Sequence, residues 1–381
     1  MKKNTGLVIF FIITCLILGC APPKGKDLTT IPEPKYLLKE VGIDWVYSLA
    51  IAPDDSNKIY AATEYGVYRS NDKANTWKAA NHRLYNLNVY TVGIDPKRPE
   101  VVYAGGDGGV FKSTNNADEW VEKNIGLTNP LVRVLAIDPN NSARLYAGCF
   151  GSGGLFISDN GAESWEMVEG ELSTLQITSM AIVSNQPDKI YIGTWEKGIY
   201  KSEDRGMSFY PVNTGLSSLN IRDIALTGVG SETIYAAVEG GVFKSENEGK
   251  SWELKMEGLL NPHIWTLLIS PDQTDIIYAG TWIGGIYKSE DGGKSWQNIN
   301  VGLVNTSVHT LICDPKDANI IYAGTERGIF QTIDGGIFWK AKNKGLTRLV
   351  KEIIPPPIPK EKRKKAPTPK PSHGTSEGGG H

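Results

Sequence analysis

Cysteine, histidine and excess charge are all scarce in this chain of 381 residues, and each scarcity argues against a class of protein. The four cysteines include Cys15 and Cys20 near the start, which leaves Cys149 and Cys313 for the folded part. Since these two lie in different sequence repeats, we expect small apolar side chains without a disulfide bridge. No cysteines and histidines have the spacing of metal ligands, so no metal or other cofactor is predicted. The net charge of −2 argues against nucleic-acid binding.

Long apolar runs are absent apart from one near the N-terminus. Lys2 and Lys3 precede an apolar run over residues 7–18, which is too short to span a membrane. This pattern predicts a signal peptide over residues 1–19. The sequence Leu18-Gly19-Cys20 resembles the bacterial lipobox, and the resemblance implies lipid attachment at Cys20 and anchoring in the bacterial cell envelope, periplasmic or outer surface. The alternative is an ordinary signal peptide with an incidental cysteine.

Two segments outside the repeats lack the composition of a folded core. Residues 20–35 are polar and contain prolines, as expected of a tether that follows a lipid anchor. Residues 355–381 are rich in Pro, Lys and Gly and are predicted to be disordered. The basic run over residues 360–365 fits either contact with anionic lipid or a partner, or a simple solvated tail.

Between these segments an eight-residue box occurs seven times. It begins with a hydroxyl residue, has Asp or Asn at position three, and ends in Trp or Phe, and the copies are 43, 45, 44, 43, 44 and 43 residues apart. A fixed period of this size, built from strands, predicts a propeller whose blades bury their faces against one another. The boxes are Ser70 to Trp77, Ser113 to Trp120, Ser158 to Trp165, Ser202 to Phe209, Ser245 to Trp252, Ser289 to Trp296 and Thr332 to Trp339.

Each repeat has the pattern of four short strands, with alternating apolar residues, β-branched and aromatic enrichment, and Gly or Asp-Pro at the ends. The fold class is therefore all-β: a seven-bladed propeller of four-stranded antiparallel blades over residues 36–354. Three of the four spacings within the repeat are constant. The exception is the gap of 10 to 12 residues that contains the turn between strands two and three. Length therefore varies on the face opposite the box, where recognition usually occurs on a rigid scaffold.

The box itself is interpreted as structural. Its aromatic residue buries apolar surface, and the third residue closes the turn between strands three and four on backbone amides. Because Asn replaces Asp in several copies, the position needs no charge, which argues against acid–base catalysis and against a metal. The third residues are Asp72, Asn115, Asn160, Asp204, Asn247, Asp291 and Asp334.

This box resembles the Asp-box or BNR repeat, which sialidases, sortilin-type receptors, some endoglucan hydrolases and photosystem II assembly-factor-like propellers share. The stretch from Ile276 to Leu303 is most similar to the assembly-factor-like group. The resemblance covers residues 46–346 and implies the propeller fold. It implies little about function, since one scaffold carries unrelated activities.

Aromatic residues outside the boxes gather on the variable face. Trp45, Trp195, Trp265 and Trp282 all fall there, and Phe150 lies in the lengthened turn of repeat three. The second residue of each inner strand is predicted to ring the mouth of the central channel. Aromatic surface interleaved with fixed donors suits protein or sugar binding; the alternative is that these residues only plug the channel. The ring residues are Tyr47, Tyr90, Arg133, Thr178, Arg222, Trp265 and His309.

No catalytic residue is predicted. The variable face offers five carboxylates, but nothing in the sequence selects the pair that a glycosidase needs. The sialidase F/Y-R-I-P segment is absent, and the endoglucan hydrolases that share the repeat contain two propellers. We therefore expect a non-catalytic scaffold for a protein partner in the envelope, such as an assembly or stability factor for a membrane complex; the alternative is glycan binding or hydrolysis on the same face. The carboxylates are Glu64, Asp107, Glu196, Glu239 and Glu326.

Ring closure is left open by the sequence. Residues 36–41 resemble a fourth strand and residues 349–354 a degenerate first strand. Either segment fits as an addition to the seventh blade or as a strand across the seam. The prediction is seven blades in both cases.

Overall fold

The computed structural model describes residues 36–227, 233–304 and 306–353. The predicted signal peptide, the tether with Cys20 and the tail over 355–381 lie outside these residues. Residues 40–349 form one compact unit. The regular secondary structure of the described residues is strand, apart from one 3₁₀ turn, η1 (Glu171–Ser173). No helix among them has the length and apolar character to cross a membrane.

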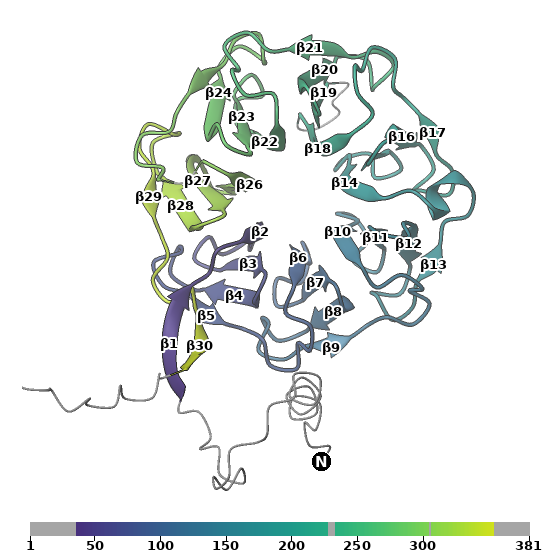
Figure 1. The fold of residues 1–381 in the computed structure, drawn as a ribbon. Coiled ribbons are helices and arrows are strands. Elements are labelled where there is room, and N and C mark those ends of the chain that lie inside the picture. The colour runs from purple at the N-terminus through teal and green to yellow at the C-terminus, as the bar shows by residue number, and fades with distance from the viewer. Residues whose placement is uncertain (1–35, 228–232, 305, 354–381) are drawn as a thin grey trace, which may run out of the picture. The chain divides into compact units, whose positions relative to one another are not determined.

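Seven blades of four antiparallel strands form a ring, with the strands of each blade in sequence order from the channel outwards (Figure 1). This confirms the predicted fold class. The innermost strands are β2 (Val46–Ile51), β6 (Val89–Ile94), β10 (Val132–Ile137), β14 (Ile177–Ile182), β18 (Ile221–Leu226), β22 (Ile264–Ile269) and β26 (Val308–Asp314). The second strands are β3 (Ile59–Thr63), β7 (Val102–Gly106), β11 (Leu145–Cys149), β15 (Ile190–Thr194), β19 (Ile234–Val238), β23 (Ile277–Thr281) and β27 (Asp317–Thr325).

The outer half of each blade is shorter. The third strands are β4 (Gly66–Ser70), β8 (Gly109–Ser113), β12 (Leu155–Ser158), β16 (Gly198–Ser202), β20 (Gly241–Ser245), β24 (Ile286–Ser289) and β28 (Gly328–Thr332). The fourth strands are β5 (Lys78–Ala79), β9 (Val121–Glu122), β13 (Glu166–Met167), β17 (Tyr210–Pro211), β21 (Glu253–Lys255), β25 (Gln297–Asn298) and β29 (Lys340–Ala341).

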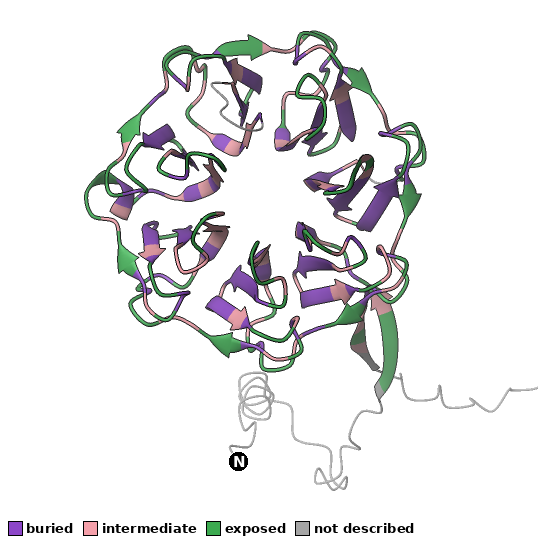
Figure 2. Ribbon diagram, turned by 180° about the vertical axis from the view of Figure 1, so that it is seen from behind, coloured by how far each residue is buried: buried purple, intermediate pink, exposed green. Residues whose placement is uncertain are grey.

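Burial follows position in the blade (Figure 2). The second strands are buried along their length in six blades and over the last five residues of β27, because both of their faces pack against neighbouring blades. The fourth strands are exposed almost throughout. The core therefore lies between blades, as expected when no single blade can bury its own faces.

The box aromatic residue joins each blade to the preceding one. Six of the seven boxes end in Trp, and each of these indole N–H groups donates a hydrogen bond to a backbone carbonyl beside the fourth strand of the preceding blade. At the seam, Trp77 Nε1 donates to Lys342 O over 2.8 Å, so the first blade binds the seventh in the same way as the five other pairs whose box ends in Trp. Phe209, in the fourth blade, has no N–H to donate.

Strands β1 (Tyr36–Gly42) and β30 (Thr347–Ile353) pair with each other in a separate two-stranded sheet. The seventh blade consists of β26 to β29 alone. The option that one of these segments adds to the seventh blade is therefore wrong. The two segments come from opposite ends of the ring, and they satisfy their backbone groups by pairing with one another.

Candidate functional site at the mouth of the channel

A β-bulge occurs at the same position in all seven inner strands. In the first blade Val46 pairs with Thr63 and Ser48 with Ala62, which leaves Tyr47 as an extra residue without a partner. Bulges re-aim side chains and are common beside functional sites. The seven extra residues are the ring predicted from the sequence: Tyr47, Tyr90, Arg133, Thr178, Arg222, Trp265 and His309.

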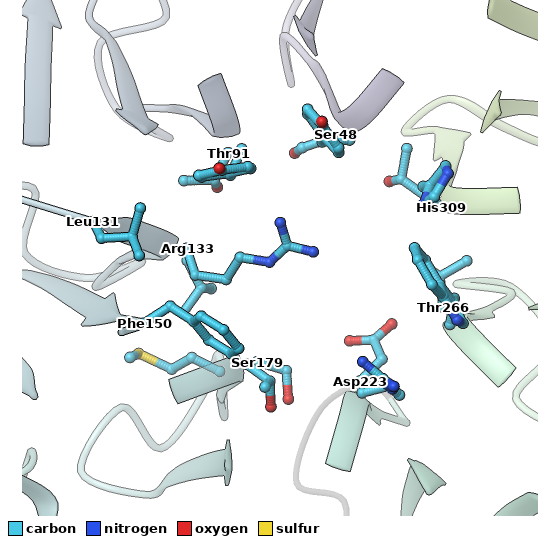
Figure 3. Close-up of a pocket in the computed structure, with 17 residues that line it drawn as sticks. Ser48, Thr91, Leu131, Arg133, Phe150, Ser179, Asp223, Thr266 and His309 are labelled. Carbon is cyan, nitrogen blue, oxygen red and sulfur yellow. The ribbon is translucent and has the colours of Figure 1, made fainter. Parts of the chain in front are cut away.

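These side chains surround a cavity of about 470 Å³ in the channel (Figure 3). Phe150, from the turn between β11 and β12, also lines it. The structure thus brings all seven ring residues and Phe150 to one cavity. The other three predicted residues, Trp45, Trp195 and Trp282, are absent from the lining, but each contacts a ring residue directly.

An aromatic cluster forms one side of the mouth. The ring of His309 lies 4.5 Å from Trp265 and 4.9 Å from Trp45, measured between ring centroids. Tyr47 continues the cluster, 5.9 Å from Trp45. Trp282 stands 5.9 Å from Trp265 and is 47% exposed, so this side of the mouth offers flat apolar surface to a ligand.

Two guanidinium groups occupy the other side. Arg133 lies 4.9 Å from the Tyr90 ring and 5.9 Å from the Tyr47 ring. Arg222 lies 4.2 Å from the Trp195 ring and 5.8 Å from Trp265. Stacking on aromatic faces holds both groups in place through cation–π attraction.

Burial changes the protonation of two groups in the mouth. Burial, together with the nearby charge of Arg133, lowers the pKa of His309 to about 4, so the imidazole is neutral at pH 7. Burial and a hydrogen bond with Asp107 raise the pKa of Tyr90 to about 12, so its phenol keeps its proton. Neither group has a pKa near neutrality, where a general acid or base works best.

Asp223 is a lining residue that sequence reasoning missed. Its Oδ1 accepts the N–H of Ile224 over 2.9 Å and its Oδ2 accepts the N–H of Leu267 over 2.8 Å, across to the next blade. Burial raises its pKa to about 6 against the effect of these bonds. Its position in the sequence could have identified it, because polar residues that directly follow a ring residue also line the cavity. These residues are Ser48, Thr91, Ser179, Asp223, Thr266 and Thr310.

Four of the five carboxylates of the variable face lie close to mouth residues. Glu64 Oε1 accepts the N–H of Trp45 at 3.4 Å, and Asp107 Oδ2 accepts from Asn88 at 2.8 Å. Glu239 accepts from Asn220, and Glu326 Oε1 lies 3.7 Å from His309 Nε2. For the fifth, Glu196, the structure gives a backbone bond to Asn220 Oδ1. The five carboxylates come from the turns of different blades. Among the described residues, no group of three or more His, Cys, Asp or Glu side chains is arranged to hold a metal ion.

No protein-family model and no curated protein matches the sequence. Solved structures match it by fold. The GH74 xyloglucanase from Xanthomonas campestris has a TM-score of 0.68 at 19% identity, covering 82% of this chain and 56% of that chain. YCF48 from Cyanidioschyzon merolae has a TM-score of 0.59 at 16% identity, covering 77% of this chain and 98% of that chain. YCF48 bound to D1 peptide has a TM-score of 0.60 at 13% identity, covering 80% and 96%.

These similarities show a shared propeller fold and no more. The chain spans just over half of the xyloglucanase, and all three identities are below 20%. The fold is thus found both in glycoside hydrolases and in a protein solved with a bound peptide, which leaves function to be argued from the mouth itself.

Proposed function

We propose that this chain is a non-catalytic binding propeller, anchored by lipid at Cys20 in the bacterial cell envelope, whose channel mouth holds a protein partner. The observation that carries the proposal is the ring of bulged residues, which presents aromatic faces and two arginines to one cavity. Trp, Tyr and Arg are the residue types that dominate protein-binding hot spots. A role in assembling or stabilising a membrane complex is supported by the likeness in fold to YCF48, which has been solved with a D1 peptide.

Glycan binding or hydrolysis is the second candidate. The likeness in fold to a GH74 xyloglucanase supports it, since sugars also bind on aromatic faces. One observation weighs against hydrolysis. Mouth carboxylates such as Glu64 and Asp107 accept hydrogen bonds from neighbouring backbone or amide groups.

The test is co-purification from detergent-solubilised membranes, run beside a glycan array with the same protein. The double variant Trp195→Ala and Trp282→Ala removes two aromatic faces from the mouth. It should lose at least 90% of the captured partner, while Phe338→Ala, an exposed aromatic residue in a box on the opposite face, should retain it. Retention of partner and glycan binding by the double variant would place the binding surface elsewhere. Glycan binding without protein capture would favour the second candidate.

A further inference from the structure

Arg133 carries a positive charge that no described residue neutralises. It makes no ion pair and no hydrogen bond within the described part of the chain, and its guanidinium lies over the faces of Tyr47 and Tyr90. Arg133 is partly buried, and this burial lowers its pKa from the ordinary value. A partly buried cation without an ionic partner is costly. Figure 3 shows it reaching towards the centre of the channel.

The positive charge of the channel is increased by Arg222. Within the described residues this guanidinium also has no ion pair, only contacts with Trp195 and Trp265. Burial lowers its pKa, the carboxylate of Glu239 on the rim raises it, and the charge of Arg133 lowers it, so the two cations repel one another. Asp223, which lines the same cavity, makes no ion pair with either arginine, and its two oxygens accept backbone N–H groups.

Ser179 Oγ and His309 Nε2 are buried in the wall of the cavity and make no hydrogen bond with any described residue. Ser179 Oγ lies against Gly193 of β15, and His309 Nε2 lies 3.7 Å from Glu326 Oε1. The donors that face the cavity are therefore the two guanidinium groups, which are suited to an anion. Arg133 and Arg222 come from the third and fifth blades, so the feature belongs to the channel and not to one strand.

The rim of the mouth limits which anion fits. Glu64, Asp107, Glu239 and Glu326 follow the second strands of four blades, near the arginine and aromatic residues. Such a rim disfavours a multiply charged phosphate, because like charges repel. A single carboxylate carries less charge, and a planar guanidinium matches it with two parallel hydrogen bonds.

We propose that the channel cavity is a receptor for one carboxylate group, bound by Arg133 with support from Arg222. The inference rests on the proposed function, since the carboxylate would belong to the protein partner held at the mouth. It names the chemistry that this partner presents: a chain-end carboxylate or an Asp or Glu side chain that enters the channel, with its neighbouring residues against the aromatic cluster.

Small probes test the subsite without the partner. N-acetylphenylalanine represents a chain-end carboxylate and the α-amide of N-acetylglutamate represents a side-chain carboxylate, and each has a neutral amide counterpart. Titration calorimetry with the full chain should show binding of at least one acid, with at least tenfold weaker binding of its amide. Which acid binds identifies the source of the carboxylate. Equal binding of acid and amide, or binding of neither acid, overturns the proposal.

Variants then assign the binding to Arg133. Arg133→Met should weaken binding of the acid at least tenfold, and Arg133→Lys should give an intermediate loss because charge remains without the planar pair of donors. Arg327→Gln is the matched control, since it removes one charge from a turn on the same face and should leave binding unchanged. Equal binding by Arg133→Met and the wild type overturns the assignment.

Thermal stability separates a binding role from a structural one. If the role of Arg133 is to bind a ligand, replacing it with Met removes a partly buried charge that has no ionic partner, and the melting temperature should rise. A fall in the melting temperature, with no acid bound by the wild type, would make Arg133 a structural residue. The same variants distinguish a failure of the proposed function from a failure of the carboxylate subsite. If Trp195→Ala/Trp282→Ala still captures the partner, the channel mouth is not the binding face. If the double variant loses the partner but Arg133→Met still captures it, only the carboxylate subsite is refuted.

Discussion

At the scale of single residues, the box shows why Asp and Asn are equivalent at its third position. In the sixth box Asp291 Oδ1 accepts from Ser289 Oγ over 2.8 Å and from the N–H of Ser295 over 2.9 Å. In the third box Asn160 Oδ1 accepts from the matching groups over 2.9 Å each. Both side chains supply the same oxygen. The second atom differs: Asp291 Oδ2 accepts from the Ser295 hydroxyl, whereas Asn160 Nδ2 donates to Ser164.

This equivalence predicts a specific pH effect for Asp291→Asn. Hydrogen bonds from the Ser295 hydroxyl and N–H lower the pKa of Asp291 to about 2. A carboxyl whose pKa is lowered by folding stabilises the fold above its unfolded pKa of about 4, and this stabilisation is lost as the pH falls towards 2. The variant should therefore change stability by less than about 0.5 kcal/mol at pH 7 and lose less stability than the wild type between pH 4 and pH 2. Melting temperatures over this pH range provide the measurement.

Asp291→Ala is the control, because it removes both acceptor oxygens and should be destabilised even at pH 7. If Asp291→Asn keeps the full acid sensitivity of the wild type, the carboxylate is not the group that titrates.

The indole N–H of the box tryptophans gives a second prediction. Trp120 is 1% exposed, and its Nε1 donates to Ala80 O over 2.7 Å. Trp120→Phe leaves this buried carbonyl without its donor and creates a small cavity, which should cost about 2 kcal/mol of unfolding free energy. Chemical denaturation provides the measurement. A loss below about 0.5 kcal/mol would show that the indole N–H adds little, and that the packing of the ring and the 3.1 Å bond from Trp120 N to His82 O are enough to join the blades.

At the scale of elements, an asparagine that follows the fourth strand of the same blade holds the turn between the second and third strands at the mouth. In five blades the residue four positions after the box aromatic is Asn, and its Oδ1 accepts the N–H of the first or second residue of the third strand. Asn213 illustrates the geometry. A Cβ added at Gly198, whose φ is +81°, would lie 2.3 Å from Asn213 Oδ1, so the glycine makes room for the amide. The sequence contains this signal, but its meaning depends on a contact between two loops.

Asn213→Ala should loosen the turn that bears Trp195. The variant removes the 2.7 Å bond to Ile199 N and the bond to Lys197 O, which should cost about 1–2 kcal/mol. Amide hydrogen exchange should speed up at Ile199. Asn81→Ala, in the first blade, is the matched control, since it loosens a different turn and should leave exchange at Ile199 unchanged. Unchanged exchange in Asn213→Ala would show that the remaining bonds of the turn are sufficient.

The sequence predicted the elements better than their irregularities. The constant spacings were enough to predict four strands per blade and to place the ring residues on one face, because period and alternation are local properties. The bulge at Tyr47 and its six counterparts was not predictable, since a bulge depends on the register between two strands. The lack of an ionic partner for Arg133 could not be predicted either, since it depends on side chains from several blades.

At the scale of the whole molecule, closure is the part of the fold that local patterns leave open. Trp77 Nε1 donates to Lys342 O, and Ile43 N donates to Leu346 O over 3.2 Å, so residues from the two ends of the ring meet at the seam. Tyr68 adds a bond from its hydroxyl to Thr347 O over 2.8 Å. Contacts between residues so far apart in the sequence produce no periodic pattern. The sequence alone therefore left two placements open for residues 36–41 and 349–354.

Residues from several blades together set the electrostatic potential in the channel, and the pKa of His309 depends on it. Its imidazole lies between Trp45 and Trp265, with Glu326 Oε1 at 3.7 Å and the charge of Arg133 nearby. Burial is the larger cause of its pKa of about 4, and Arg133 is the second. Arg133→Met should therefore raise the pKa of His309 while leaving it below the ordinary 6.5.

This change is measurable by NMR titration of the imidazole protons, with His309→Gln to assign the signal and the other four histidines as internal references. Because the unfolded chain binds a proton to this group at higher pH than the folded one, His309 lowers stability as the pH falls from about 6.5 to about 4. His309→Gln should remove that part of the pH dependence, and Arg133→Met should narrow its window. If the His309 signal titrates identically in the wild type and in Arg133→Met, the two groups do not share a field, and the charge of Arg133 is neutralised within the channel.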